Sequence, residues 1–398
     1  MALYIHIPFC EVRCPYCDFN TYSGIEHLIP AYVDALALEI SLWASYLRQD
    51  GGKAGQPQQI KTVFFGGGTP SYLPPEYIRR LLDTVRSAFA LDSAAEITME
   101  SNPGDIVLDR LRAWKSAGVN RLSMGVQSLD DALLRLLGRR HDAEMARQAY
   151  RDARQAGFDN VNLDLMYGLP HQSLEQWRQT LDEMLAMRPD HLSMYCLTLE
   201  GGTPMEAWVR QGKLPDPDPD LAADMYCLAE DMAAKAGYQH YEISNWALPE
   251  RECDHNLVYW RNQPYLGVGP GAHSYLGGFR FANLKSPQEY IRRVKQWSQE
   301  GVQALDLSSP GQGSPVETSE VIDARMAMAE TMMLGLRLDE GVSEEGFRQR
   351  FGVGLRETYA LQIAELEQVG LLEWAHDSLK LTDRGHLLGN EVFQRFLA

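Results

Sequence analysis

Three cysteines, Cys10, Cys14 and Cys17, are the residues whose type and spacing most directly predict chemistry in this chain. Cysteine thiolates are the usual protein ligands of iron–sulfur clusters, and a cubane cluster normally takes four of them. Three thiolates leave one iron open for a small molecule, much as a catalytic zinc site keeps one position open. The triad therefore predicts a [4Fe-4S] cluster with one free coordination position.

Two other interpretations of the triad are weaker. A disulfide requires an oxidising compartment, and nothing in the chain indicates one. A structural zinc ion requires a fourth ligand, for which His6 and Asp18 are candidates, but the spacing matches no common zinc finger. The cluster is the favoured interpretation.

The segment that leads into the triad, Tyr4-x-His6-x-Pro8-Phe9-Cys10, resembles the HemN/HemW group of radical SAM proteins. The resemblance covers nearly the whole chain. It implies that the open iron binds S-adenosylmethionine. It also implies an α/β fold, a partial barrel of six β/α units with the cluster at the carboxyl ends of the strands, followed by a winged-helix-like α+β domain.

A glycine-rich turn, Gly66-Gly67-Gly68-Thr69-Pro70, follows the second predicted strand. Glycines allow the backbone to approach a ligand closely and to present its N–H groups. In radical SAM proteins this element contacts the methionyl end of S-adenosylmethionine. We therefore expect Gly67, Gly68 and Thr69 to bind the cofactor.

Polar residues also lie at or near the ends of the next predicted strands, where β/α barrels carry their chemistry. The resemblance assigns Arg139 to the cofactor, and the adjacent Arg140 is the alternative at this position. Tyr4 and Tyr16 match family positions next to the methionyl and adenine ends of the cofactor. The resemblance assigns three further residues to the cofactor: Glu100, Gln127 and Asp164.

A second motif, Asp254-His255-Asn256-Leu257-Val258-Tyr259-Trp260, lies far beyond the triad. A histidine among aromatic residues is most often a buried residue with satisfied hydrogen bonds. The motif also matches the His-Asn-x-x-Tyr-Trp signature of HemW-type proteins, which is linked there to haem, and imidazole is a common haem ligand. We expect His255 to bind haem, with Cys253 as the rival ligand. Cys196 and Cys227 are expected to be core residues.

Three departures from HemN favour a HemW-type protein. Phe19 stands where HemN proteins carry a fourth cysteine, the chain starts almost at the first strand, and the His255 motif is present. The resemblance then implies a haem chaperone that passes haem to haem-requiring, notably respiratory, proteins. The alternatives are an oxygen-independent coproporphyrinogen III oxidase and a haem-sensing regulator built on the winged helix.

The composition is that of a globular protein, with 398 residues, 45% of them hydrophobic, and a net charge of −17. This acidity argues against a nucleic-acid partner, which would require a basic face. We see neither a secretory signal nor a stretch approaching a membrane span, and expect a cytoplasmic protein whose contact with membranes is transient. The expected partners are haem and haem-acceptor proteins.

Alternating strand and helix patterns must position these residues. Gly- and Pro-rich stretches predict a loop at 49–59, an irregular segment at 241–275 and a linker at 308–314. We divide the chain into a barrel core (1–200), an extension that carries the His255 motif (201–307) and a C-terminal domain (315–398). The predicted strands are 3–7, 61–65, 96–100, 121–125, 160–165, 191–196, 371–374 and 379–382; the predicted helices are 30–47, 75–88, 107–116, 143–156, 174–186, 221–236, 321–336, 343–351 and 355–369.

Overall fold

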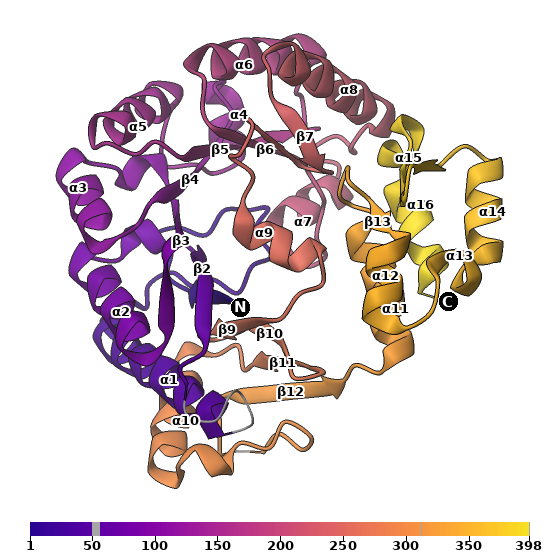
Figure 1. Ribbon diagram of the computed structural model, residues 1–398. Coiled ribbons are helices and arrows are strands. Elements are labelled where there is room, and N and C mark those ends of the chain that lie inside the picture. Colours follow the sequence, from indigo (N-terminus) through magenta and orange to yellow (C-terminus); the bar gives the residue numbers. More distant parts are fainter. Residues whose placement is uncertain (50–55, 312, 398) are drawn as a thin grey trace.

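A curved sheet with an outer layer of helices forms most of the computed structural model, which describes residues 1–49, 56–311 and 313–397 (Figure 1). Six parallel strands follow one another in chain order, each joined to the next through one or more helices. This is the predicted partial barrel. Its elements are β1 (Ala2–Ile7), α1 (Ile29–Gln49), β2 (Gln59–Gly67), α2 (Pro75–Ala88), β3 (Ala90–Ser101), α3 (Leu108–Ala117), β4 (Arg121–Gln127), α4 (Asp131–Leu136), α5 (Ala143–Gln155), β5 (Val161–Tyr167), α6 (Leu174–Met187) and β6 (His191–Cys196).

The segment predicted to be irregular is in fact mostly regular, and it extends the sheet at both edges. Strand β9 pairs parallel to β1, and β8 pairs antiparallel to β6, which gives a 12-stranded sheet. The prediction was wrong because these strands are only three to five residues long and depend on partners distant in sequence. The elements here are α7 (Pro204–Arg210), α8 (Pro219–Lys235), β7 (Gln239–Glu242), β8 (Asn245–Ala247), α9 (Asp254–Trp260), β9 (Tyr265–Val268), β10 (His273–Leu276), β11 (Phe279–Asn283), α10 (Pro287–Glu300) and β12 (Val316–Val321).

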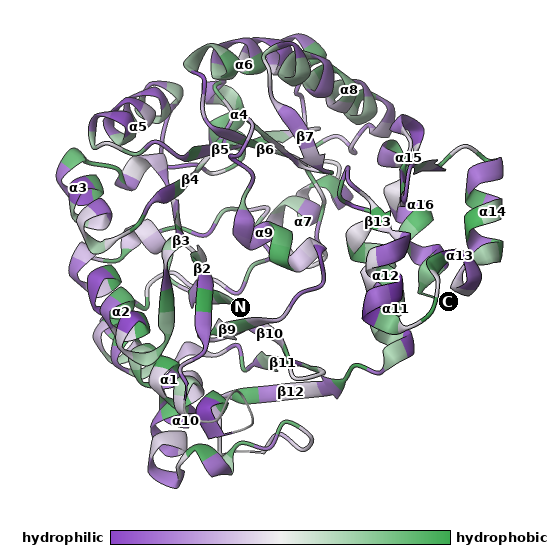
Figure 2. Cartoon of the chain, viewed as in Figure 1, coloured by the Kyte–Doolittle hydropathy of each residue, from purple (hydrophilic) through white to green (hydrophobic). Residues whose placement is uncertain are grey.

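The barrel strands alternate apolar and polar residues with the period of two that a strand imposes. In β4 the apolar residues Leu122 and Met124 are fully buried in the main hydrophobic core. The residues that alternate with them, Ser123 and Gly125, line a cavity inside the barrel. The outer helices carry hydrophobic and hydrophilic residues together, as expected of helices with one face on a sheet (Figure 2). The strand pattern therefore gives the barrel a polar interior.

Helix α1 with the turn before it, 26–49, is long and apolar enough to cross a membrane, and no other helix among the described residues is. The composition-based expectation overlooked it. Its residues Tyr32, Leu36 and Trp43 are fully buried, and it packs against α2 and α10. Its carboxylate Glu39, also fully buried, accepts hydrogen bonds from Gly269 N, Asn283 and Tyr290. These contacts are those of a core helix.

The C-terminal domain has a hydrophobic core of its own, and a three-stranded sheet completes its winged-helix-like fold. The loop predicted as a linker at 308–314, apart from residue 312, which lies outside the described residues, leads into β12 of the main sheet. The chain thus passes to this domain after Val321. Its elements are α11 (Ala324–Gly335), β13 (Val342–Ser343), α12 (Glu344–Phe351), α13 (Leu355–Thr358), α14 (Ala360–Gln368), β14 (Leu372–Ala375), β15 (Ser378–Leu381), α15 (Asp383–Leu387) and α16 (Gly389–Phe393).

One further expectation was wrong, and another concerns residues outside those that the structure describes. Cys196 and Cys227 are exposed and are not core residues, because Cys196 ends β6 at the cavity and Cys227 lies on the outer face of α8. The loop predicted at 49–59 includes residues 50–55, which lie outside the described residues.

Candidate functional site

The loop that carries the three cysteines is held against the barrel at both ends. Its first residue donates a backbone hydrogen bond, Cys10 N to Tyr22 O at 2.9 Å, and Tyr22 N donates to Pro8 O at 2.7 Å. In the middle of the loop, Met205 N donates to Pro15 O at 3.0 Å. The cysteine side chains therefore start from a fixed backbone at the mouth of the cavity.

Each of the three sulfurs has a polar partner. The Thr69 hydroxyl donates to Cys10 Sγ at 3.4 Å, and Arg139 Nη1 donates to Cys14 Sγ at 3.6 Å. Cys17 Sγ and Thr21 Oγ1 lie 4.0 Å apart. Donors directed at sulfur favour the thiolate form, which is the form that binds metal.

The thiols fit a cluster better than a single metal ion. All six cysteines are free, and Cys10, Cys14 and Cys17 line one cavity. Among the described residues, no three His, Cys, Asp or Glu side chains converge on one point as they would around a single ion. In a cubane cluster each thiolate binds a different iron, so the sulfurs need not converge. Burial raises the pKa of the Cys10 and Cys17 thiols, so cluster binding would release protons.

The cavity has a volume of about 450 Å³, in the range of small-molecule sites, and it runs from the cysteine loop into the barrel. Gly67, Gly68 and Thr69 line it, as expected. A Cβ at Gly68 would lie 2.8 Å from Ile7 O, so only glycine allows this turn to lie against the first strand. The N–H groups of Gly68 and Thr69 bond to Ile7 O and Phe9 O, so the turn's main contribution is close packing beside the cysteines.

Of the carboxyl groups that line this cavity, Glu100 and Asp164 are carried by barrel strands. Burial, reinforced by the nearby Asp164, raises the pKa of Glu100 to about 8, and Gly67 N donates to its carboxyl at 3.1 Å. Burial also raises the pKa of Asp164 to about 6, although Asn162 donates to Asp164 at 2.7 Å. A pair of shielded acids suits a ligand that carries positive charge, such as a sulfonium or an ammonium group.

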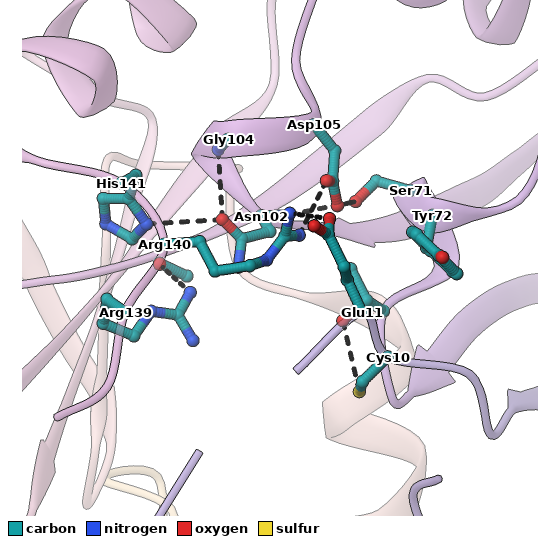
Figure 3. Close-up of polar contacts among 12 residues, drawn as sticks. Cys10, Glu11, Ser71, Tyr72, Asn102, Gly104, Asp105, Arg139, Arg140 and His141 are labelled. Atoms are coloured by element: carbon teal, nitrogen blue, oxygen red, sulfur yellow. Dashed lines mark hydrogen bonds and ion pairs between the residues drawn. The ribbon is translucent and has the colours of Figure 1, made fainter. Parts of the chain in front are cut away.

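The structure distinguishes the two adjacent arginines. Arg139 Nη2 donates to Gly125 O at 2.6 Å, and its Nη1 reaches Cys14. Arg140 instead forms ion pairs with Glu11 and with Asp105, the latter at 2.7 Å (Figure 3). Arg139 is therefore the arginine at the cysteines, whereas Arg140 fastens the cysteine loop to the turn after β3.

Gln127 lies beside Arg139, at the end of β4, with a φ of 68°. Such a backbone conformation is uncommon for a residue other than glycine and is found preferentially at functional sites. A Cβ at Gly125 would lie 2.9 Å from Gln127 Nε2 and 3.1 Å from Arg139 Nη2. The small residue therefore makes room for both side chains at the cavity.

The two tyrosines differ in position. Tyr16 lines the cavity and packs on a small apolar cluster that includes Leu137 and Met205. Tyr4 does not line the cavity; its hydroxyl lies 3.0 Å from His6 Nδ1, and its ring stacks on Phe64. Tyr16 therefore lies at the cavity with the cysteines, whereas Tyr4 packs behind the cavity residue Phe64.

His255 lies on α9, inside the barrel, and only 1% of it is exposed. Its Nδ1 lies 2.9 Å from Thr62 Oγ1, and its Nε2 lies 2.9 Å from Tyr259 OH. Both ring nitrogens are therefore engaged, and Asn256, not His255, lines the cavity. The rival Cys253 is fully buried and contacts Glu96.

Comparison with known proteins places these features in a family. Residues 4–184 match the model of the radical SAM superfamily, and residues 322–388 match the HemN C-terminal domain. The chain is 36% identical to heme chaperone HemW of Bacillus subtilis (strain 168) over 397 residues, which is 100% of this chain and 99% of that protein. The chain belongs to the HemW family of radical SAM proteins.

Two other proteins bear on this family. Heme chaperone HemW of Escherichia coli (strain K12) is 36% identical over 402 residues, covering 100% of this chain and 98% of that protein. The structure of coproporphyrinogen III oxidase (HemN) from Escherichia coli has a TM-score of 0.81 at 26% identity, and the match covers 99% of this chain and 89% of that one. This HemW-family chain therefore has the fold of HemN, and the similarity includes the extension at 201–307 and the C-terminal domain.

Arg121 is among the cavity residues that sequence reasoning did not identify. Arg121 starts β4 and lines the inner end of the cavity. Its alternation with Ser123, Gly125 and Gln127 along one strand was the signal that could have identified it, because residues two apart share a face.

Proposed function

We propose that the protein binds haem and delivers it to haem-requiring proteins, and that it does so with a [4Fe-4S] cluster and S-adenosylmethionine. The observation that carries this proposal is the full-length similarity to proteins named heme chaperone HemW. The cysteine cavity supports the cofactor part, because three free thiols and two shielded acids share one cavity.

In this proposal Cys10, Cys14 and Cys17 hold the cluster. When bound, the cluster supplies an electron and an open iron for the amino and carboxylate groups of S-adenosylmethionine. Thr69 and Arg139 donate to the sulfurs and so stabilise their thiolate form. Further cofactor contacts come from residues that line the same cavity, and Tyr4 would act from behind them through Phe64. The contacts we propose are Tyr16, Gly67, Gly68, Thr69, Glu100, Gln127, Arg139 and Asp164.

We also propose that His255 binds the haem iron. For this, its ring must first give up a hydrogen bond. One ring nitrogen must leave its partner, Thr62 or Tyr259, before it can bind iron, while the other nitrogen can keep its hydrogen bond. An ordinary hydrogen bond contributes about 1 kcal/mol, which a coordination bond can offset. Burial lowers the pKa of His255 to about 3, so the ring is neutral and keeps a lone pair for the metal.

The acceptors we propose are respiratory haem proteins, reached from the cytoplasm by transient contact at the membrane. The second candidate function is coproporphyrinogen III oxidation, which the similarity to HemN favours. Against it stands Phe19, 64% exposed at the cavity, where HemN proteins carry a cysteine.

One preparation can separate the two functions. The protein is reconstituted anaerobically, titrated with haem, mixed with a haem-free cytochrome, and supplied in parallel with coproporphyrinogen III, reductant and S-adenosylmethionine. We expect stoichiometric haem binding, transfer to the cytochrome and no protoporphyrinogen. Repeated turnover of coproporphyrinogen III without haem transfer would replace the proposal with the oxidase.

A further inference from the structure

Arg121 is a buried guanidinium that has no hydrogen-bond partner among the residues the structure describes. Only 2% of the residue is exposed, and its Nε is buried without a partner. Its single ion pair, to Glu96, is long at 3.9 Å. Guanidinium carries five N–H donors, and a buried donor left unpaired is costly. The side chain nevertheless is one of those that line the cavity, so a molecule in the cavity can supply the missing partner.

The polar groups around Arg121 have other partners. Glu96 accepts hydrogen bonds from the backbone N–H groups of Asp254 and His255, at 3.1 and 3.2 Å. Asp164 accepts from Asn162, whose Oδ1 is in turn bonded to His191 at 2.7 Å. Arg121 is therefore the member of this network that is left with free donors, and an anion is the group that would complete it.

Arg121 lies away from the cysteine end of the cavity, although its charge also favours the ionised form of Asp164, one of the proposed cofactor contacts. Arg121 starts β4 and Gln127 ends it, so the two are ~20 Å apart at the usual rise of a strand. Arg139 and the cysteines lie at the Gln127 end. Phe64 and Tyr195 line the cavity as well, and they offer aromatic surface to a flat ring. A carboxylate held at the cysteines is thus a different group from one held at Arg121.

We infer that Arg121 binds a carboxylate of the cargo, a propionate arm of a porphyrin that enters the barrel with its ring against these aromatic side chains. The planar fork of guanidinium matches a carboxylate in a bidentate pair. The inference rests on the proposed haem function. It adds the position of the cargo in the barrel and the group that orients it.

The first test needs no mutation. Haem and haem dimethyl ester, which lacks the charged propionates, are titrated into the wild-type protein carrying its cluster. A charge-assisted pair predicts that haem binds about tenfold to a hundredfold more tightly than the ester. Equal affinities would overturn the inference while leaving haem binding intact. Failure of haem itself to bind would instead overturn the proposed function.

The second test assigns the discrimination to one residue. Arg121→Gln should bind haem and the ester equally, and Arg121→Lys should keep part of the preference as a point charge. Arg112→Gln, at a mostly exposed arginine on α3, is the matched change of charge and should keep the full preference. Iron content and affinity for S-adenosylmethionine report whether each variant is folded. A folded Arg121→Gln with an unchanged preference would show that Arg121 is only a counter-ion of Glu96.

Discussion

The guanidinium of Arg139 lies 3.6 Å from the sulfur of Cys14 and also donates to Gly125 O at 2.6 Å. One side chain therefore joins the cysteine loop to the end of β4. A positive charge at this distance stabilises a thiolate and any reduced, more negative cluster that the thiolate binds.

Replacing Arg139 should change both cofactors. In Arg139→Gln we expect S-adenosylmethionine to bind about tenfold more weakly or worse, because a charge-assisted contact is lost. The reduction potential of the cluster should fall, since the reduced state loses a nearby positive charge. Isothermal titration and a redox titration followed by electron paramagnetic resonance measure the two effects.

The neighbouring arginine supplies the control. Arg140→Gln removes the same charge but breaks ion pairs to Glu11 and Asp105 instead. It should loosen the loop without a comparable loss of cofactor affinity. Equal effects of the two variants would mean that Arg139 has no specific role.

The cysteines allow a matched comparison of their own. Cys14→Ala should lose most of its iron and the brown absorbance, because two thiolates cannot hold a cubane. Cys196→Ala removes an exposed cysteine from the same cavity and should keep a full complement of iron. Iron and sulfide analysis after reconstitution decides the point, and iron retained in Cys14→Ala would exclude the triad as cluster ligands.

Much of the fold could be predicted from the sequence because its signals are local. The strand before the cysteines, helix α2 and helix α6 were predicted within a residue or two, since each has a clear hydrophobic period. The family resemblance supplied the cavity residues on β3, β4 and β5, and the rule that chemistry lies at strand ends agreed with it.

The parts that were missed depend on contacts distant in sequence. Strand β9 exists because Tyr265–Val268 pairs with β1, more than 250 residues earlier, and nothing local marks it. The engagement of His255 by Thr62 is equally non-local. The choice between Arg139 and Arg140 needed the positions of Cys14, Glu11 and Asp105 in space.

Glu100 should make the stability of the cluster-free protein depend on pH. Its pKa is about 8 in the folded protein against 4.5 as the ordinary value, because burial and Asp164 disfavour the charge. Between these values the folded state holds a proton that the unfolded state has lost. The free energy of unfolding therefore falls as pH rises from about 4.5 to about 8.

Glu100→Gln removes this dependence. At pH 8.5 the variant should be more stable than the wild type by roughly 4 kcal/mol, and at pH 5 the difference should be small. Urea unfolding of cluster-free protein at both pH values measures it. A pH slope that is the same in the variant would mean that Glu100 is already ionised in the folded protein.

Removing a hydrogen-bond partner of His255 should strengthen haem binding, whereas most substitutions at a buried contact weaken function. If His255 binds iron only after leaving Thr62, then Thr62→Val, which cannot hydrogen-bond the ring, should free one nitrogen. We expect Thr62→Val to bind haem about threefold to tenfold more tightly, since one hydrogen bond of about 1 kcal/mol no longer competes.

His255→Ala should shift the Soret band and weaken haem binding, while its cluster and its affinity for S-adenosylmethionine persist. The double variant Thr62→Val/His255→Ala should behave like His255→Ala alone, because the gain acts through the imidazole. Should the Soret band move in Cys253→Ala and not in His255→Ala, the thiolate beside Glu96 is the ligand, and the ring of His255 serves only to hold α9 on β2.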